Sequence, residues 1–212
     1  MNKQTTNNLK YICIEGNIGS GKSTLAKALA KQLQAIYLPE AFEENELLPL
    51  FYKDARQFGF PLEYSFLINR FNQIKQALPT KGPGTNVPNK LIIADYSIYK
   101  CLWFAKINLS KRDFIFFEKH FNAILNELPK PDIIIHLTTD IKNLKQNIKK
   151  RCRTYEQTLT TEYLKQIEKQ YTKGIKKIKV NNILEININT YSTTLIKDTL
   201  KFIDGFLKDL NK

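Results

Sequence analysis

Apolar residues follow two different periodicities along this chain, and the two alternate. Short apolar runs rich in β-branched residues predict buried strands, whereas apolar residues at helical spacing predict amphipathic helices. The expected strands are 11–15, 35–38, 91–94, 131–137 and 183–188. The expected helices are 22–33, 45–58 with a break near Pro49, one that starts at Pro61, 97–126, 141–150, 161–180 and 195–210. This alternation favours an α/β fold of three layers, a five-stranded parallel sheet with helices on both faces.

Three smaller features refine this prediction. Residues 80–89 contain two prolines and two glycines and read as a loop. Phe114, Phe117 and Phe121 form a stripe on one helix face, which indicates core or a subunit interface rather than a cofactor site. His136 lies inside an apolar run and is interpreted as a packed strand residue. Because no linker or repeat interrupts the pattern, residues 1–212 are expected to form one domain.

The turn between the first strand and the first helix carries a phosphate-binding pattern. Its glycines permit a tight loop, and Lys22-Ser23 follows at the spacing G-x-x-x-x-G-K-[ST]. Backbone N–H groups and a helix N-terminus favour phosphate, Lys22 can reach the β/γ-phosphates, and the Ser23 hydroxyl can ligate Mg²⁺. A P-loop NTPase fold that binds ATP is therefore expected. The predicted ATP-binding residues are Gly16, Asn17, Ile18, Gly19, Ser20, Gly21, Lys22, Ser23 and Thr24.

Composition narrows the class of protein. The 212 residues are 42% hydrophobic and 25% charged, which is ordinary for a globular protein. No apolar run approaches the ~20 residues of a membrane span, and residues 1–8 lack the apolar core of a signal peptide. The three cysteines have no metal-binding spacing. We therefore expect reduced thiols, a cytoplasmic location and no membrane partner.

The net charge of +13 raises the question of a nucleic-acid partner. The lysines fall mostly on predicted helix faces, and no nucleic-acid recognition motif accompanies them. A positive field also attracts anionic nucleotides to an enzyme. Small-molecule nucleotides are therefore the expected partners, and nucleic acid is not.

Ionisable residues follow the predicted strands at the edge where ligands collect in open α/β sheets. Glu40 comes after the second strand and Asp95 after the third, while Arg151 and Arg153 follow the helix after the fourth. Phosphoryl transfer needs a proton acceptor, a metal and cations for the transition-state charge. Glu40 is the candidate base, Asp95 a metal ligand with Ser23 or a second base, and Arg151 and Arg153 the cationic clamp, with Lys22 as a further catalytic cation.

In these residues the chain resembles the deoxynucleoside kinases, especially the bacterial deoxyadenosine/deoxyguanosine kinase-like branch. The matching pieces run in the family's order over about residues 10–175, and the ordered set is specific although each later piece alone is weak. They are Gly16–Thr24, Pro39-Glu40 with Glu44-Asn45, Phe51-Tyr52, Phe66-Leu67 with Arg70, Asp95-x-Ser97-Ile98-Tyr99 with Phe104-Ala105, Pro131-Asp132, Lys150-Arg-Cys-Arg-x-x-Glu-Gln157, and Glu162-Tyr163-Leu164.

The resemblance implies Mg·ATP-dependent phosphorylation of a deoxynucleoside 5′-hydroxyl by a homodimer packed through helices. It implies that Glu40 deprotonates that hydroxyl and that Tyr52 and Glu156 hold the 3′-hydroxyl. It places Arg70 beside the 5′ end and near the base, and makes Arg151 and Arg153 part of a lid at about 150–160. The expected substrate-binding residues are thus Glu40, Tyr52, Glu63, Arg70, Asp95 and Glu156.

Three residues depart from the family pattern. Tyr96 stands where the family has an arginine near the reacting phosphate, a loss worth about 3 kcal/mol in rate unless Arg70 or a lysine substitutes. Cys101 replaces an acid of the base pocket, and Glu63 replaces a base-reading glutamine. An ionised Glu63 offers only acceptors, which suits guanine, whereas a protonated one imitates glutamine. We hypothesise that Glu63 contacts the base and favours purines.

The leading interpretation is therefore a purine-preferring deoxynucleoside kinase. A nucleoside-monophosphate kinase of the thymidylate type shares the fold and the P-loop, but needs arginines around an acceptor phosphate. The third possibility is a degenerate family member that binds nucleotide as a structural or regulatory subunit. Tyr96, which replaces the family's arginine near the reacting phosphate, is the feature that supports it.

Overall fold

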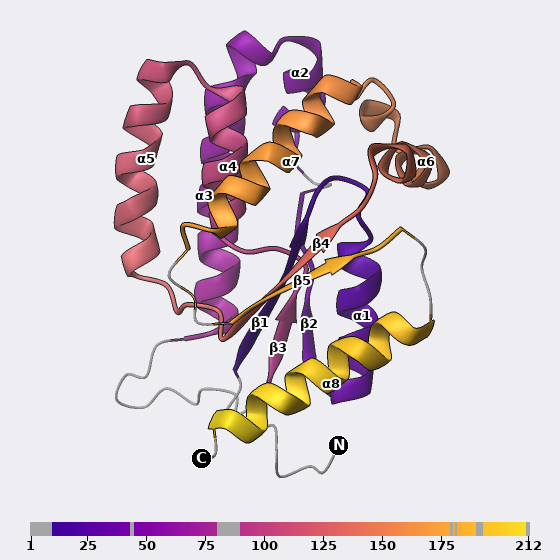
Figure 1. The fold of residues 1–212 in the computed structure, drawn as a ribbon. Coiled ribbons are helices and arrows are strands. Elements are labelled where there is room, and N and C mark those ends of the chain that lie inside the picture. Colours follow the sequence, from indigo (N-terminus) through magenta and orange to yellow (C-terminus); the bar gives the residue numbers. More distant parts are fainter. Residues whose placement is uncertain are drawn as a thin grey trace.

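The sheet that carries the predicted strands is five-stranded and all-parallel, as the sequence predicts. The computed structural model describes residues 10–42, 45–79, 90–178, 180, 182–189 and 193–210. The predicted loop 80–89 and Glu44 lie outside these residues. The strands run in the order β2-β3-β1-β4-β5 (Figure 1). Their bounds are Tyr11–Gly16 (β1), Ile36–Leu38 (β2), Ile92–Ala94 (β3), Ile133–Thr138 (β4) and Ile183–Asn187 (β5).

Side chains of the central strand alternate between two hydrophobic cores. Tyr11 and Cys13 belong to one core, while Ile12 and Ile14 belong to the other. Successive residues of a strand point to opposite faces, so a strand covered on both sides has an unbroken apolar sequence. The two cores are the two contact surfaces of a three-layer fold.

Helices cover both faces of this sheet (Figure 1). On one face lie α1 (Lys22–Leu33) and α8 (Thr193–Leu210), whose side chains pack in the core with Ile12 and Ile14. The other face is covered by α3, α4, α5 and α7, which surround the core with Tyr11 and Cys13. These four helices span Ala55–Ala77, Tyr99–Asn108, Lys111–Asn126 and Thr161–Ile175.

Helix boundaries near the two prolines differ from the prediction. Pro49 lies in the first turn of α2 (Leu47–Lys53), where a missing N–H costs no intrahelical hydrogen bond. The predicted break near Pro49 is wrong. Pro61 lies inside α3, which begins six residues earlier than predicted. The side chain of Asp54 starts α3 by accepting from the backbone N–H groups of Arg56 and Gln57.

The helical stretch predicted at 97–126 is two helices, α4 and α5. Ser110 divides them, because its hydroxyl accepts from the N–H of Asp113 and caps α5. The Phe114, Phe117 and Phe121 stripe lies in the core of this chain, so it is not the subunit interface. His136 is a buried strand residue, as interpreted, and its ring stacks on Tyr171.

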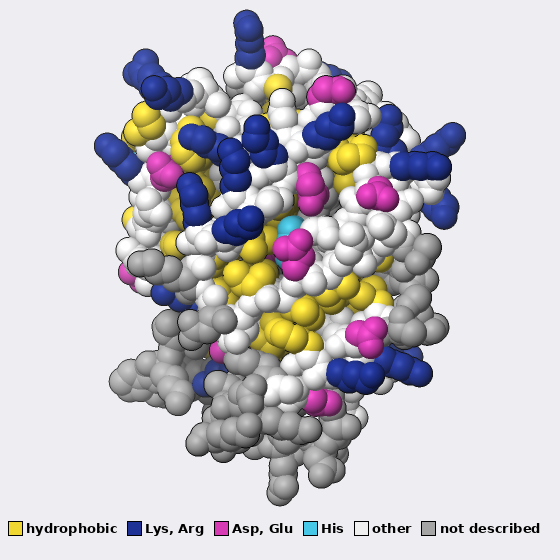
Figure 2. Space-filling view, viewed as in Figure 1, with side chains coloured by type: hydrophobic (Ala, Val, Ile, Leu, Met, Phe, Trp, Pro, Cys, Tyr) yellow, Lys and Arg dark blue, Asp and Glu magenta, His cyan; other side chains and the backbone are white. Residues whose placement is uncertain are grey.

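The remaining elements lie at the carboxyl end of the sheet. α6 (Ile141–Arg151) is followed by a short 3₁₀ turn, η1 (Thr154–Glu156), at the predicted lid. α7 ends at Ile175 rather than at 180. Figure 2 shows Lys and Arg side chains spread over the α6 and α7 side of the molecule, with acidic side chains among them. In the described part of the chain, no helix is long and apolar enough to span a membrane.

Candidate active site

The P-loop joins β1 to α1 in the conformation that its glycines allow. Gly16, Gly19 and Gly21 have φ values of 152°, 82° and 85°. A Cβ at Gly16 would lie 2.5 Å from the carbonyl oxygen of Leu137 on the neighbouring strand, so a side chain does not fit there. The loop can therefore approach a phosphate closely through its backbone.

Lys22 occupies the concave side of this loop. Its Nζ donates to the carbonyl oxygens of Gly16 at 2.9 Å and Asn17 at 2.8 Å. Burial, followed by the positive charge of Lys100, lowers the pKa of Lys22 to about 8. A bound phosphate anion would favour the protonated form, so this lysine is suited to a negatively charged ligand.

Glu15 fixes the base of the P-loop to two other elements. Its Oε1 accepts from the backbone N–H and the hydroxyl of Ser97, both at 2.6 Å, and its Oε2 accepts from the Tyr171 hydroxyl at 2.9 Å. Burial raises the pKa of Glu15, which these hydrogen bonds oppose. The network holds the loop after β3 and helix α7 in register with the phosphate site.

Asp95 positions the backbone of Glu40. Its Oδ1 accepts from the Glu40 N–H at 2.7 Å, and its Oδ2 accepts from the Tyr37 hydroxyl at 2.8 Å. The carboxyl ends of β2 and β3 are adjacent in the sheet, which brings these residues together as the sequence predicts. Asp95 lies behind Glu40 and supports it.

The Glu40 carboxylate lies between two cations. Lys100 Nζ donates to its Oε1 at 2.8 Å and to its Oε2 at 2.6 Å, and Arg70 Nη2 donates to Oε1 at 2.5 Å. Burial by itself raises the pKa of Glu40, but Lys100 and Arg70 lower it to about 2. Glu40 is therefore ionised and able to accept a proton.

One cavity connects the P-loop with Glu40 and with a more apolar pocket between α2, α3 and α4. Most of the predicted site residues line this cavity, including Ile18, Lys22 and Ser23 on the phosphate side. Asp95 is not among its lining residues. The remaining predicted residues in its wall are Glu40, Tyr52, Glu63, Arg70, Arg151, Arg153 and Glu156.

Glu156 holds the two arginines of the lid segment. Arg151 donates from Nε to Glu156 Oε2 at 2.8 Å, and Arg153 Nη1 lies 3.5 Å from Oε1. The guanidinium of Arg153 also lies 4.6 Å from the centroid of the Phe42 ring. Tyr52 stacks on Tyr155 beside this cluster. Arg151, Arg153 and Glu156 thus form one wall of the cavity.

Glu63 lies buried at the opposite, inner end. Its Oε1 accepts from Asn108 Nδ2 at 2.7 Å, and Asn108 Oδ1 accepts from the Tyr163 hydroxyl at 3.0 Å. Its Oε2 is buried and lacks a hydrogen-bond partner among the described residues. Burial raises the pKa of Glu63 to about 7. A buried polar atom in a cavity wall is costly unless a ligand pairs with it.

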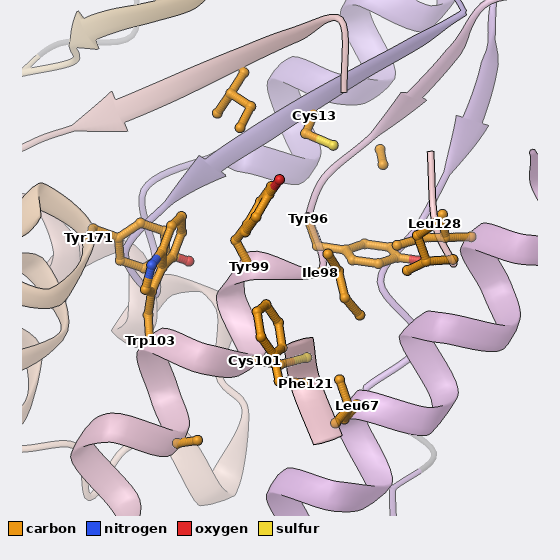
Figure 3. Close-up of a cluster of buried hydrophobic side chains, with 14 of the residues drawn as sticks. Cys13, Leu67, Tyr96, Ile98, Tyr99, Cys101, Trp103, Phe121, Leu128 and Tyr171 are labelled. Carbon is orange, nitrogen blue, oxygen red and sulfur yellow. The ribbon is translucent and has the colours of Figure 1, made fainter. Parts of the chain in front are cut away.

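Tyr96 and Cys101 take part in packing rather than in phosphate contact. Tyr96 is fully buried and donates to Gln73 Oε1, and Figure 3 shows its ring extending toward Leu128 within the core. Cys101 is buried nearby, and its sulfur accepts from Arg70 Nη1 at 3.0 Å. Beside Arg70, a second cation that contacts Glu40 comes from Lys100, one residue before Cys101.

Sequence reasoning gave no site role to three polar residues of the cavity wall, Lys100, Asn108 and Tyr163. Lys100 stands in the first turn of α4, and the packing of this helix places its ammonium group against Glu40. Asn108 and Tyr163 come from the ends of helices that only the tertiary fold brings together. Nothing in the local sequence of Asn108 distinguishes it from a surface residue, whereas Tyr163 stands in a segment that resembles the family.

The fold and this cavity define a P-loop phosphotransferase site, in which a phosphate cradle faces an ionised carboxylate. The sequence profile of the deoxynucleoside kinase family matches residues 12–205. The chain is 31% identical to a deoxyguanosine kinase of Bacillus subtilis (strain 168), over 96% of this chain and 99% of that protein. It is 35% identical to a deoxyadenosine kinase of Dictyostelium discoideum, over 79% and 67% respectively. The chain belongs to the deoxynucleoside kinase family.

Solved structures of related enzymes have the same fold. Deoxyadenosine kinase from M. mycoides with bound dATP superposes with a TM-score of 0.80 at 25% identity, covering 93% of this chain and 100% of that chain. The same enzyme with the products dCMP and a flexible dCDP gives a TM-score of 0.79 at 26% identity, over 92% and 98%. The predicted fold class and kinase activity are confirmed.

Proposed function

We propose that this enzyme transfers the γ-phosphoryl group of ATP to the 5′-hydroxyl of a purine deoxynucleoside. The observation that carries the proposal is the single cavity in which Lys22 of the P-loop and the ionised Glu40 carboxylate face the same space. A base must lie within hydrogen-bond reach of the hydroxyl that it deprotonates. The apolar pocket beyond Glu40 is then available to the sugar and the base.

Glu40 would accept the proton of the 5′-hydroxyl as the oxygen bonds to phosphorus. The sugar would lie between Glu40 and the lid segment, where Tyr52 and Glu156 present their oxygens to the 3′-hydroxyl. Arg151 and Arg153 would reach the donor phosphates when Glu156 turns to the sugar. Phosphoryl transfer is catalysed mainly by positioning and by such cations, so these residues supply what the reaction requires.

Ser23 lines the cavity and offers a hard hydroxyl oxygen of the kind that Mg²⁺ prefers. Both oxygens of Asp95, the other predicted ligand, instead accept hydrogen bonds from Glu40 and Tyr37, and Asp95 does not line the cavity. No cluster of three metal-ligating side chains occurs within the residues that the structure describes. Kinases need only one or two such groups, because the phosphates complete the coordination of Mg²⁺. The Ser23 hydroxyl therefore fits Mg²⁺ bound with ATP, where the ion would neutralise phosphate charge.

Glu63 would read the base. Asn108 occupies its Oε1, so the unpartnered Oε2 is the atom left for a ligand. As a carboxylate it accepts from guanine N–H groups, and as a carboxylic acid it donates to a ring nitrogen of adenine. The 31%-identical relative is a deoxyguanosine kinase, which also favours a purine.

Replacement of Glu63 by glutamine tests this role. We expect Glu63→Gln to lower the ratio of kcat/KM for deoxyguanosine over deoxyadenosine about tenfold, since an amide N–H repels the guanine donors. Asn126→Gln, on the exposed end of α5, is a matched control that should leave the ratio unchanged. An unchanged ratio in Glu63→Gln would remove this residue from base recognition.

The direct test offers purified protein with Mg·ATP each of the four deoxynucleosides, the ribonucleosides and TMP. Deoxynucleoside 5′-monophosphates, with purines preferred, are the expected products. Product from TMP alone would favour the thymidylate-type kinase, and no product from any acceptor would favour a nucleotide-binding subunit without activity. The intact Lys22, Ser23, Glu40, Arg151 and Arg153 support the active enzyme.

We also propose that the protein is a cytoplasmic homodimer whose 212 residues act as one domain. The unpaired Cys13, Cys101 and Cys152 suit a reducing compartment. The basic surface carries acidic groups between its lysines and arginines, which suits small anionic ligands better than a nucleic-acid backbone (Figure 2). The α3–α5 side is the candidate dimer face.

A further inference from the structure

We propose that Lys100 is a catalytic cation that stabilises the phosphoryl group in transit between ATP and the nucleoside. This inference rests on the proposed function, and it assigns a role to a residue that the P-loop and lid do not include. The supporting observations are the contacts of Lys100 with Glu40, its burial, and its place with Lys22 in the wall of one cavity.

Lys100 lies between the donor and acceptor parts of the cavity. Its Nζ bonds both oxygens of Glu40, the proposed base, and Lys100 lines the same cavity as Lys22 of the P-loop. Two ammonium groups in one cavity repel each other, and a phosphate anion between them would relieve the repulsion. The transferring γ-phosphoryl group carries such charge.

Arg70 is fixed differently from Lys100. Its Nη1 donates to Cys101, its Nη2 donates to Glu40, and its guanidinium lies 4.6 Å from the centroid of the Phe66 ring. These contacts hold Arg70 on the acceptor side of Glu40. Lys100 has a flexible side chain whose ammonium carries three rotatable donors, so it can turn from Glu40 to a phosphoryl oxygen when the 5′-hydroxyl binds.

In the chemical step, the 5′-oxygen forms a bond to the γ-phosphorus, and its proton passes to a Glu40 oxygen. The bond between that phosphorus and the bridging oxygen breaks, and its electron pair leaves with ADP. Lys100 keeps its proton throughout and donates hydrogen bonds to the phosphoryl oxygens, which lowers the energy of the charged transition state.

Substitution of Lys100 tests the proposal with deoxyguanosine and deoxyadenosine as acceptors. We expect Lys100→Met to lower kcat by 10²- to 10³-fold, the usual effect of removing one transition-state donor, with the nucleoside KM changed less than about threefold. Lys100→Arg should retain most of kcat. Lys106→Met is the matched control, because Lys106 is exposed on the same helix with its Nζ over the Phe114 ring.

A pH profile separates catalysis from a structural role. Loss of the Lys100 charge should raise the pKa of Glu40, so the acid limb of kcat/KM in Lys100→Met should move to higher pH. A packing defect alone would reduce the active fraction without moving that limb. The charged groups that face Glu40 or share its cavity are Lys22, Arg70, Asp95, Glu63, Arg151, Arg153 and Glu156, and all remain in the variant.

The outcomes are distinct. A kcat within threefold of wild type and an unmoved acid limb in Lys100→Met would overturn the role of Lys100 while leaving the kinase function intact. A wild-type protein that phosphorylates no deoxynucleoside would instead overturn the proposed function. Circular dichroism checks folding, and Lys100→Gln is the second variant. If the methionine, glutamine and arginine variants all fail to fold, Lys100 is structural and the proposal is wrong.

Discussion

At the scale of single residues, Glu15, Glu40 and Glu63 have three different environments. Glu15 accepts hydrogen bonds from Ser97 and Tyr171 at both oxygens, and Glu40 is paired with two cations. Glu63 has one oxygen bonded and one without a partner. The groups that the fold places around each glutamate therefore suit it to a different role: Glu15 to a structural brace, Glu40 to the proposed base and Glu63 to the proposed base-reading group.

The raised pKa of Glu63 predicts a pH dependence of stability. Its folded-state pKa of about 7 lies above the ordinary value of 4.5, so the folded state holds an extra proton between these values. Stability from this group is complete below about pH 4.5 and is lost as pH rises through 7. Glu63→Gln should remove this loss, so its unfolding free energy relative to wild type should increase by about 1–3 kcal/mol between pH 5 and pH 8.

Urea unfolding at both pH values measures this difference. Glu127→Gln, an exposed residue after α5, is the control and should show no such change. Glu15 and Glu168 also have raised pKa values and add to the slope in every variant, so only the difference from wild type is diagnostic. An equal slope in Glu63→Gln and wild type would contradict burial of a protonated Glu63.

At the scale of secondary-structure elements, capping side chains set two helix boundaries that the hydropathy pattern did not predict. Asp54 separates α2 from α3, and Ser110 separates α4 from α5. Asp54→Ala should lower the unfolding free energy by about 1 kcal/mol, because two N–H groups of α3 lose their acceptor. Asp54→Asn keeps an acceptor and should cost much less. Equal losses in the two variants, measured by urea unfolding, would assign the effect to charge rather than to the cap.

Strands and the P-loop could be predicted because their signals are local. Buried parallel strands are continuous apolar runs, and the glycines and Lys22 of the P-loop are adjacent in sequence. Glu40 and Asp95 could be placed because parallel strands end at one edge. The roles of Lys100 and Asn108 could not be predicted, because they depend on how α4 packs against Glu40 and α3. The helix boundaries predicted at Pro49 and Pro61 are wrong because the effect of a proline depends on its position within a helix.

At the scale of the whole molecule, the phenylalanine stripe predicted to be core or a subunit interface is core. Phe117 and Phe121 of α5 lie in the core. On the same helix, Phe116 is 54% exposed and Ile115 is 48% exposed. Ile68 on α3 is 45% exposed, and these two helices contact each other. Large exposed apolar side chains on neighbouring helices are typical of a protein–protein interface.

The proposed homodimer would therefore bury the exposed side of α3 and α5. Phe116→Glu places a charge on that face and should convert the dimer to a monomer, because an unpaired charge in an apolar interface is costly. Sedimentation velocity measures the change. Ile36→Lys alters a 39%-exposed apolar residue on β2, away from this face, and should leave the dimer intact. Dissociation by both variants, or by neither, would contradict an interface on α3 and α5.

Since the catalytic cavity is lined by residues of one chain, the Phe116→Glu monomer should keep its affinity for ATP.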